Sequence, residues 1–291
     1  MRLSAADLRQ LAECAATAAK EAGALIAGYD GREVPVQHKA GGDSLASQVL
    51  TEVDQQSQAI ILKHLQLTCA AYDLSLLTEE EAHDGSRFVK DAFWCIDPLD
   101  GTLPFTESIP GYAVSIALVA NDGRPLIGVI YDPSTGTQYQ AVAGQGALRN
   151  GEPWMLQSKA EPAPLHFIGD RSMASHPQFE IVIEQLQALA TELGQGGLET
   201  RLTGGAVMNA LWVLEQAPAC YFKFPKPQVG GGSLWDYAAT ACLYNELGAW
   251  CSDFDGQPLD LNRADSTFMN HRGVLFASGL ALGQRLLSLE G

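Results

Sequence analysis

The chain has 291 residues, of which 46% are hydrophobic, and this is the composition of a globular protein with a sizeable core. It carries 34 Asp and Glu against 18 Lys and Arg, which gives a formal net charge of −16. A surface this acidic argues against partners that are bound through basic stripes, namely nucleic acid polymers and anionic membranes. It leaves open small anionic ligands that are bound through divalent cations held by clustered carboxylates.

The six cysteines are spread along the chain without a CxxC pair, which is typical of reduced thiols in a cytosol. The N-terminus shows no basic region followed by an apolar run, so no signal peptide is expected. The longest apolar stretch, residues 112–120, is too short to span a bilayer. We therefore expect a cytoplasmic protein without a membrane segment.

The first elements expected are helices. Apolar residues between Leu8 and Ile26 recur at helical spacing, and Ser4 with Asp7 resembles a capping box. A loop over 38–49 and a second helix over 51–65 are expected next. Strands are then predicted over 74–77, 92–96, 112–120, 126–131 and 137–143, with a hairpin turn at Asn121-Asp122-Gly123.

The Pro-containing segment 159–164 is expected to separate an N-terminal lobe, 1–158, from a C-terminal lobe, 159–291. The second lobe is predicted to contain helices over 178–193, 206–216 and 234–247, strands over 198–202, 219–224 and 273–277, and a last helix at its end. Gly248 is expected to terminate the 234–247 helix. Helices and strands alternate without a regular βαβ rhythm, which favours a layered α+β or mixed α/β architecture.

The segment 94–102, Trp-Cys-Ile-Asp-Pro-Leu-Asp-Gly-Thr, is the most informative part of the chain. Pro98 fixes φ and interrupts strand pairing, so the chain has to turn directly after Asp97. The carboxylates of Asp97 and Asp100 and the carbonyl of Leu99 can then converge on one point. Three converging oxygens suit a hard cation such as Mg²⁺.

Gly101 permits the tight backbone of this turn and, with Thr102, leaves N–H groups at a possible helix start, where a phosphate can bind. A solvated turn rich in Asp, Pro and Gly is the alternative explanation. A D-x-D-G-T phosphatase loop of the haloacid dehalogenase type is disfavoured, because the two aspartates here are three residues apart and lie far from the N-terminus.

Further acidic residues lie elsewhere in the chain. Glu79 and Glu80 follow a predicted strand, and Asp236 lies at the start of a predicted helix. Each also has a structural explanation: a solvated acidic turn for the glutamates, and the helix dipole for Asp236. Asp54 could likewise belong to a capping box with Thr51.

Taken in chain order, Thr51 with Asp54, Glu79-Glu80, the 97–102 motif and Trp235-Asp236 resemble the inositol monophosphatase superfamily. That superfamily includes the 3′(2′),5′-bisphosphate nucleotidases and, more distantly, fructose-1,6-bisphosphatase. The similarity covers residues 36–262. Two glycine motifs also match turns of the family, namely Gly204-Gly205-Ala206, where the family has a substrate loop, and Gly144-x-Gly146-Ala147.

The resemblance implies a five-layer αβαβα sandwich and Mg²⁺-dependent hydrolysis of a phosphate monoester, with two or three Mg²⁺ in each site. Members of the family are often dimeric, and we expect a homodimer; they are also often inhibited by lithium.

The implied metal ligands are Glu79, Asp97, the Leu99 carbonyl, Asp100 and Asp236. The implied catalytic residues are Thr102 and Asp54, which orient and activate the attacking water, together with Glu79. A ligand role for Glu80 stays open. The expected substrate contacts are Gly101, Thr102, Gly204, Gly205, Ala206, Lys223 and Lys226.

The charges of these acids make a metal a requirement. The four carboxylates among the ligands carry −4, which two Mg²⁺ would cancel. A phosphate at ~5 Å from a bare carboxylate meets a repulsion of about 3 kcal/mol per unit pair at an effective dielectric constant of ~20. Without a cation, the cluster could not bind the substrate.

The substrate is the least defined property. Lys223 stands where inositol monophosphatases usually carry a Glu, and Lys226 follows it, which suggests a second anionic group on the substrate. Leu103-Pro104 replaces the family's usual Lys-Glu pair, which argues in the other direction. The sequence favours 3′-phosphoadenosine 5′-phosphate, followed by inositol monophosphate and then by sugar bisphosphates. A non-catalytic homologue that binds a ligand or partner is the alternative of another class.

Overall fold

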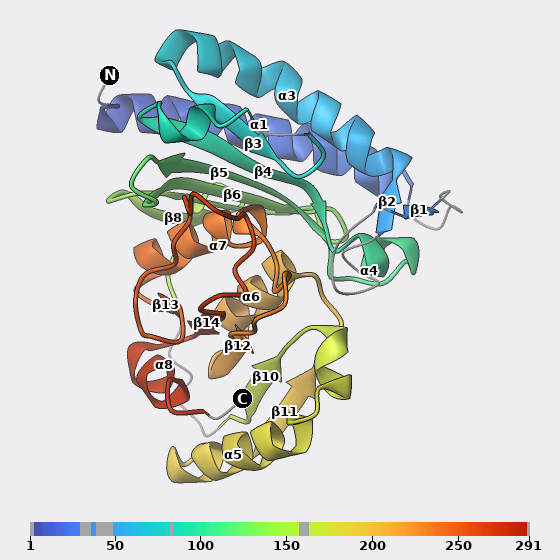
Figure 1. Ribbon diagram of the computed structural model, residues 1–291, viewed down its shortest axis with the longest axis vertical. Coiled ribbons are helices and arrows are strands. Elements are labelled where there is room, and N and C mark those ends of the chain that lie inside the picture. Colours follow the sequence, from blue (N-terminus) through green and yellow to red (C-terminus); the bar gives the residue numbers. More distant parts are fainter. Residues whose placement is uncertain (1–2, 30–35, 39–48, 82–83, 157–162, 290–291) are drawn as a thin grey trace.

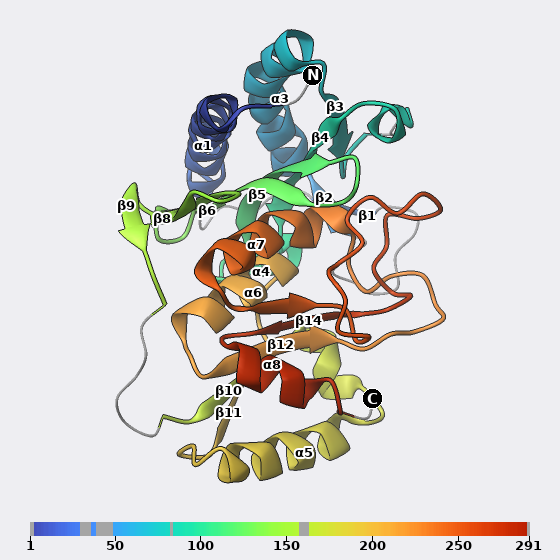
Figure 2. The same cartoon turned by 90° about the vertical axis from the view of Figure 1, so that its left-hand side faces the viewer.

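The structure is a computed structural model that describes residues 3–29, 36–38, 49–81, 84–156 and 163–289. Helical layers and β-sheets alternate through the molecule in the order helix, sheet, helix, sheet, helix (Figures 1 and 2). The α+β class expected from the sequence and the αβαβα layering implied by the family resemblance are therefore confirmed.

The larger sheet has seven strands in the order β3-β4-β5-β6-β7-β8-β9, in which β3 pairs with β4 in parallel and every later pair is antiparallel. Its central strands are apolar because helices cover both faces, and β4 and β5 are buried along their whole length. The bounds are β3 Ser75–Thr78, β4 Ala92–Asp100, β5 Ala113–Ala120, β6 Pro125–Asp132, β7 Thr137–Val142, β8 Gly146–Arg149 and β9 Glu152–Trp154.

One face of this sheet is covered by α1 (Ala5–Ala27) and α3 (Glu52–Tyr72). The predicted capping box begins α1: the Asp7 amide donates to Ser4 Oγ at 3.2 Å, and the Ser4 amide donates to Asp7 Oδ2 at 2.8 Å. Helix α3 extends seven residues beyond the predicted end at Leu65. Strands β1 (Val36–His38) and β2 (Val49–Thr51) pair with each other, and most of the loop predicted over 38–49 lies outside the described residues.

The smaller sheet has the strand order β11-β10-β12-β14-β13. Strand β10 pairs in parallel with β11 and β12, whereas β14 pairs antiparallel with β12 and β13. The bounds are β10 Leu165–Ile168, β11 Leu198–Arg201, β12 Ala219–Lys223, β13 Trp250–Ser252 and β14 Val274–Ala277. The sequence did not predict β10 and β13, because each is too short to show a clear alternation.

Helices α6 (Ala206–Glu215) and α7 (Leu234–Leu247) fill the space between the two sheets (Figure 1). Because α7 packs against β5 and β6 on one side and β13 on the other, it is apolar around most of its circumference. Gly248 ends α7 with φ of 69°, as expected. Helices α5 (Phe179–Glu192) and α8 (Leu280–Leu286) form the last layer, beyond the smaller sheet.

The predicted lobe boundary at 158/159 lies outside the described residues. The larger sheet ends at Trp154, and the smaller sheet starts at Leu165. Since α7 belongs to the second half of the chain and packs on the sheet of the first, the halves share a helical layer. A division into two lobes stays a prediction.

Candidate active site

The 97–102 motif differs in one respect from the sequence prediction, because β4 does not end at Asp97. It continues to Asp100, where Ala113 is the partner residue, after Asp97 has paired with Ser115. Three steps along β4 therefore face two steps along β5, which is a β-bulge. The bulge places the extra residue at Pro98-Leu99, so the turn that Pro98 predicted takes the form of a local kink inside the strand.

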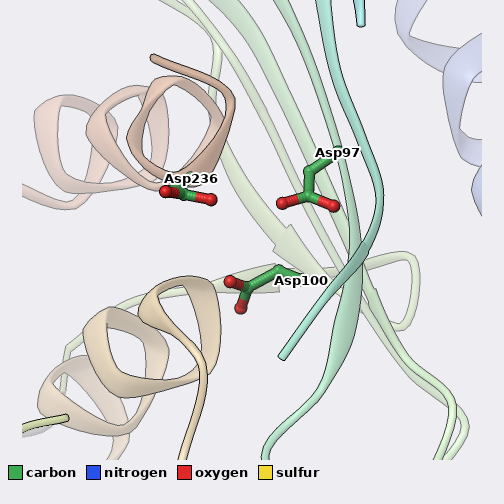
Figure 3. A group of neighbouring side chains, drawn as sticks. All are labelled: Asp97, Asp100 and Asp236. Atoms are coloured by element: carbon green, nitrogen blue, oxygen red, sulfur yellow. The ribbon is translucent and has the colours of Figure 1, made fainter. Parts of the chain in front are cut away.

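The kink brings both strand aspartates toward Asp236, which lies in the first turn of α7 (Figure 3). One carboxylate oxygen from each of Asp97, Asp100 and Asp236 lies within 4.8 Å of the others. The Asp97 and Asp100 residues are only 1% and 6% exposed, and Asp236 is partly buried. We call these three residues the acidic cluster.

Backbone amides fix the direction of each carboxylate in the acidic cluster. The Ala206 and Val207 amides, at the start of α6, donate to the two oxygens of Asp100 at 3.1 and 2.9 Å. The Leu99 amide donates to Asp97 Oδ1 at 3.0 Å, and the Ser233 amide donates to Asp236 Oδ2 at 2.6 Å. Asp236 therefore has both roles that its position suggested, since it caps α7 and also belongs to the acidic cluster.

Burial and mutual repulsion shift the pKa values of the three carboxylates in the acidic cluster. Burial raises the pKa of Asp97 well above its ordinary value, and the charges of Glu79 and the other two aspartates raise it further. Burial, followed by the charge of Asp236, also raises the pKa of Asp100 well above its ordinary value. Burial and then Glu79 raise the pKa of Asp236 to about 6, although Lys223 opposes this shift. A bound cation would therefore stabilise the ionised form of the acidic cluster.

The stability of the protein is expected to respond to Mg²⁺ in a pH-dependent way. An aspartate whose pKa is higher in the folded than in the unfolded chain destabilises the fold as pH rises between the two values, here from 3.8 to about 6 for Asp236. Two units correspond to about 3 kcal/mol, a penalty that a bound cation removes. The rise in Tm on adding Mg²⁺ should therefore be small at pH 4 and about 5–10 °C at pH 7.5.

Differential scanning calorimetry with chelator and with excess Mg²⁺ measures this difference, and NaCl at equal ionic strength is the control. An equal rise in Tm at both pH values would contradict the assignment of the acidic cluster as a cation site.

The acidic cluster lines a cleft of about 840 Å³. Most of the predicted site residues line this cleft: Glu79, Asp97, Leu99, Asp100, Gly101, Thr102, Gly204, Gly205, Ala206, Lys223, Lys226 and Asp236. The Glu79 amide donates to the Ile96 carbonyl at 3.2 Å, which places the Glu79 backbone beside β4 at the residue before Asp97. Among the described residues that line the cleft, Asp54 and Glu80 do not occur.

Asp54 is nevertheless connected to the cleft through Thr102. The Thr102 hydroxyl lies 3.3 Å from Asp54 Oδ1 and 3.2 Å from the Leu99 carbonyl oxygen, so its single proton has two acceptors. Asp54, near the start of α3, is 1% exposed, and Thr102 begins the short helix α4 (Thr102–Thr106). The structure thus brings together the pair that the resemblance implied.

The glycine loop 204–206 serves the acidic cluster more directly than the sequence suggested. The Gly205 amide donates to the Gly111 carbonyl at 2.7 Å, and the Ala206 amide is bonded to Asp100. Both amides are thus already hydrogen-bonded within the protein: the Gly205 amide fixes the loop to Gly111, and the Ala206 amide holds Asp100 in place. The loop forms a wall of the cleft.

We expect Gly205→Ala to disturb Asp100, because an added Cβ would lie 2.4 Å from Asp100 Oδ2 and 2.7 Å from the Gly101 backbone. The overpacking should cost about 1–3 kcal/mol of stability and weaken Mg²⁺ binding. Thermal unfolding during a Mg²⁺ titration measures both effects. Gly279→Ala is the matched control, since no atom lies within 4 Å of its added Cβ. Unchanged Mg²⁺ affinity in Gly205→Ala would contradict the role of this loop.

Gly144 and Gly146, by contrast, have a structural role in the described chain. Their amides donate to the carboxylate of Glu246 on α7 at 2.8 and 2.7 Å. Both glycines have positive φ, which lets the turn between β7 and β8 present its amides to one side chain. This motif fastens the larger sheet to the middle helix layer.

Sequence reasoning missed two charged residues of the cleft, Asp170 and Arg171, which follow β10. Asp170 lies 2.6 Å from the Lys223 ammonium, and Arg171 forms an ion pair with Glu107. The signal that could have found Asp170 is its place two residues after the end of a strand, but β10 itself was not predicted.

Comparison with known proteins shows which class this fold and site define. The sequence profile of the inositol monophosphatase family matches residues 7–284. A protein named inositol-1-monophosphatase from Synechocystis is 32% identical over 267 residues, which cover 89% of this chain and 84% of that protein. A protein named Nus factor SuhB from Pasteurella multocida is 30% identical and covers 82% and 83%. The structure of an inositol monophosphatase from Anabaena superposes with a TM-score of 0.70 at 26% identity and covers 98% of both chains.

The chain therefore belongs to the inositol monophosphatase family, and it is a phosphoric monoester hydrolase. In the part of the chain that the structure describes, no helix is long and apolar enough to cross a membrane.

Proposed function

We propose that the protein hydrolyses a small phosphate monoester in a Mg²⁺-dependent reaction. The observation that carries this proposal is the convergence of two buried carboxylates and one partly buried carboxylate, from two elements far apart in the sequence, on the wall of a cleft. The donor set fits the metal, since oxygen ligands select hard cations such as Mg²⁺. The residues that would hold it are Glu79, Asp97, the Leu99 carbonyl, Asp100 and Asp236, in a site for two or three ions.

Bound Mg²⁺ supplies positive charge against the phosphate oxygens and lowers the pKa of water. The protein contributes position and proton transfer. Thr102 faces the cleft and contacts Asp54, so this pair can orient a water molecule for in-line attack on phosphorus. A lone threonine is too weak a base, and the Asp54 carboxylate makes proton acceptance through the Thr102 hydroxyl feasible. Attack by water forms no covalent intermediate with the protein.

A monophosphate of a polyol, such as inositol monophosphate, is the substrate that the cleft supports best. The sequence favoured 3′-phosphoadenosine 5′-phosphate because of Lys223, but the charge of Lys223 is matched by Asp170 at 2.6 Å. The name of the Synechocystis relative agrees with the polyol. The nucleotide stays the second candidate, because the cleft is large and the half-buried Met173, Phe224 and Phe268 on its wall could contact a base.

The sequence left open a non-catalytic regulatory homologue; for a phosphoric monoester hydrolase, the candidate of another class is a regulatory function in addition to catalysis. The relative named Nus factor SuhB supports it, since that name describes a factor and not a hydrolase. The combination of the acidic cluster with the Thr102–Asp54 contact in one cleft favours catalysis.

Phosphate release from the purified protein tests the proposal. We would assay inositol 1-phosphate, 3′-phosphoadenosine 5′-phosphate and fructose 1,6-bisphosphate with Mg²⁺, with added Li⁺ and with chelator. Turnover that chelator abolishes is the expected result, whereas no release from any of these substrates would contradict the proposal. Inhibition by lithium and a homodimer are further proposals, tested by the Li⁺ arm and by light scattering.

A further inference from the structure

Asp170 and Lys223 are placed together by the parallel pairing of β10 and β12. Ile168 and Tyr221 are partner residues in that pairing, and Asp170 and Lys223 each lie two positions further on. The carboxyl ends of parallel strands meet at one edge of a sheet, so both side chains emerge at the same edge. Lys223 Nζ lies 2.6 Å from Asp170 Oδ2, and the two side chains are 20% and 27% exposed.

The Asp170 carboxylate is held by further donors on its other oxygen. The Asn209 side-chain amide donates to Oδ1 at 3.1 Å, and the Tyr221 hydroxyl donates to the same atom at 3.2 Å. Asp170 Oδ2 is thereby directed to Lys223. A carboxylate fixed by three different side chains is a prearranged group, and its position does not depend on a ligand.

The pair lines the same cleft as the acidic cluster. Burial alone would lower the pKa of Lys223, but Asp170, the Tyr237 hydroxyl and Asp236 raise it well above its ordinary value. The ammonium therefore stays charged. Lys223 Nζ lies 5.9 Å from the centre of the Tyr237 ring, and Tyr237 follows Asp236 in α7. Asn209, which donates to Asp170, belongs to α6, the helix whose first amides donate to Asp100. A substrate group that touches the Asp170–Lys223 pair is thus a near neighbour of the scissile phosphate.

We infer that the Asp170–Lys223 pair determines specificity, by accepting hydroxyl groups next to the scissile phosphate and rejecting a second phosphate there. This inference rests on the proposed function. A hydroxyl can accept from the Lys223 ammonium and donate to Asp170, so it satisfies both partners. A phosphate can accept from Lys223 but meets the Asp170 carboxylate as a like charge. The pair is neutral overall and therefore offers no net attraction to an anion.

Asp170→Asn tests this inference, because asparagine keeps the shape and leaves the Lys223 charge unmatched. The readout is the ratio of kcat/KM for matched substrates with and without a second phosphate: 3′-phosphoadenosine 5′-phosphate against 3′-AMP, and inositol 1,4-bisphosphate against inositol 1-phosphate. The wild type should prefer the monophosphates. Asp170→Asn should shift at least one ratio about tenfold or more toward the bisphosphate.

Lys223→Met is the second variant, and it leaves Asp170 facing the cleft without its partner cation. It should lower kcat/KM for the bisphosphates about tenfold relative to the monophosphates. Asp122→Asn removes one negative charge from the exposed β5–β6 turn, where Asp122 pairs with Arg124, and it should leave both ratios unchanged.

The outcomes separate the two hypotheses. If the wild type releases no phosphate from any of these substrates, the proposed function fails. If the wild type turns over and both variants keep every ratio within twofold, the pair is only structural and the inference is wrong. Circular dichroism and thermal unfolding establish that each variant is folded before its kinetics are compared.

Discussion

Asp97→Asn is expected to lower kcat/KM about 10³-fold or more and to remove the stabilisation by Mg²⁺ at the same time. The substitution keeps the size of the side chain and removes one of the three charges in the acidic cluster, at a residue that is 1% exposed. Its buried position means that water cannot replace the lost carboxylate as a ligand. Electrostatic groups preorganised in such sites are typically worth 10²–10³ in rate, and a metal ligand adds the affinity of the ion itself.

The metal-free Asp97→Asn protein should at the same time be more stable than the metal-free wild type at pH 7.5. Burial and the neighbouring carboxylates disfavour the ionised Asp97 in the folded state, and the neutral amide removes that penalty. Calorimetry with chelator measures this gain, and calorimetry with Mg²⁺ measures the lost response. A variant that is stabilised and inactive cannot owe its inactivity to unfolding.

Asp132→Asn is the matched control. Asp132 is 5% exposed and accepts hydrogen bonds from the Ser134 amide and the Thr135 hydroxyl, in a turn that does not line the cleft. This variant should lose stability and keep its response to Mg²⁺. Near-normal turnover of Asp97→Asn in Mg²⁺ would refute the assignment of the acidic cluster as the catalytic centre.

Two members of the acidic cluster could be predicted from the sequence because they lie close together along the chain. Asp97, Asp100 and Gly101 lie within five positions of each other, and their types restrict the local backbone. Asp236 was harder to assign, since its capping contact with Ser233 is a sufficient reason for an acid at that place. The resemblance to a family, and not the local pattern, singled it out.

Other features depend on contacts between distant segments and could not be predicted. The bulge at Pro98-Leu99 depends on how β4 pairs with β5, and the local sequence permits both an end and a kink of the strand. From the sequence alone, Lys223 had no recognisable partner for its charge. Its partner, Asp170, lies 53 positions earlier and follows a strand of only four residues that was not predicted. Charge matching of this kind is a property of the folded sheet edge.

The structure shows where part of the chain's net negative charge is located. Part of it is concentrated in the acidic cluster, where the raised pKa values show that the charges are not compensated by the protein alone. The cleft residue Lys223 is already matched by Asp170. Under the proposed function, attraction of an anionic substrate therefore depends on the bound cations, against the field of the remaining surface.

Thr102→Val is expected to lower kcat about 10²- to 10³-fold while KM and the response of Tm to Mg²⁺ stay close to those of the wild type. Valine has the shape of threonine and lacks the hydroxyl that lies between Asp54 Oδ1 and the Leu99 carbonyl oxygen. Loss of a positioned proton-transfer group costs this much in many enzymes. The lost hydrogen bond should reduce stability by only about 1 kcal/mol.

Asp54→Asn and the double variant show whether the two residues act as one unit. If Thr102 accepts the water proton only because of Asp54, the double variant should be about as slow as either single variant, since effects within a unit are not additive. Independent roles would make the two rate losses multiply. The kinetics would be measured at saturating Mg²⁺, so that any change in affinity for the ion does not enter kcat.

Thr106→Val is the matched control for this series, because Thr106 lies one turn further along α4 and its hydroxyl donates to the Leu103 carbonyl at 2.9 Å, away from the cleft. It should keep the wild-type kcat. A Thr102→Val variant with the same activity as Thr106→Val would show that the attacking water is oriented by other groups. Asp97→Asn should lose both the metal response and turnover, whereas Thr102→Val should lose turnover alone. The two substitutions therefore separate the part of catalysis that depends on the cation from the part that depends on the water.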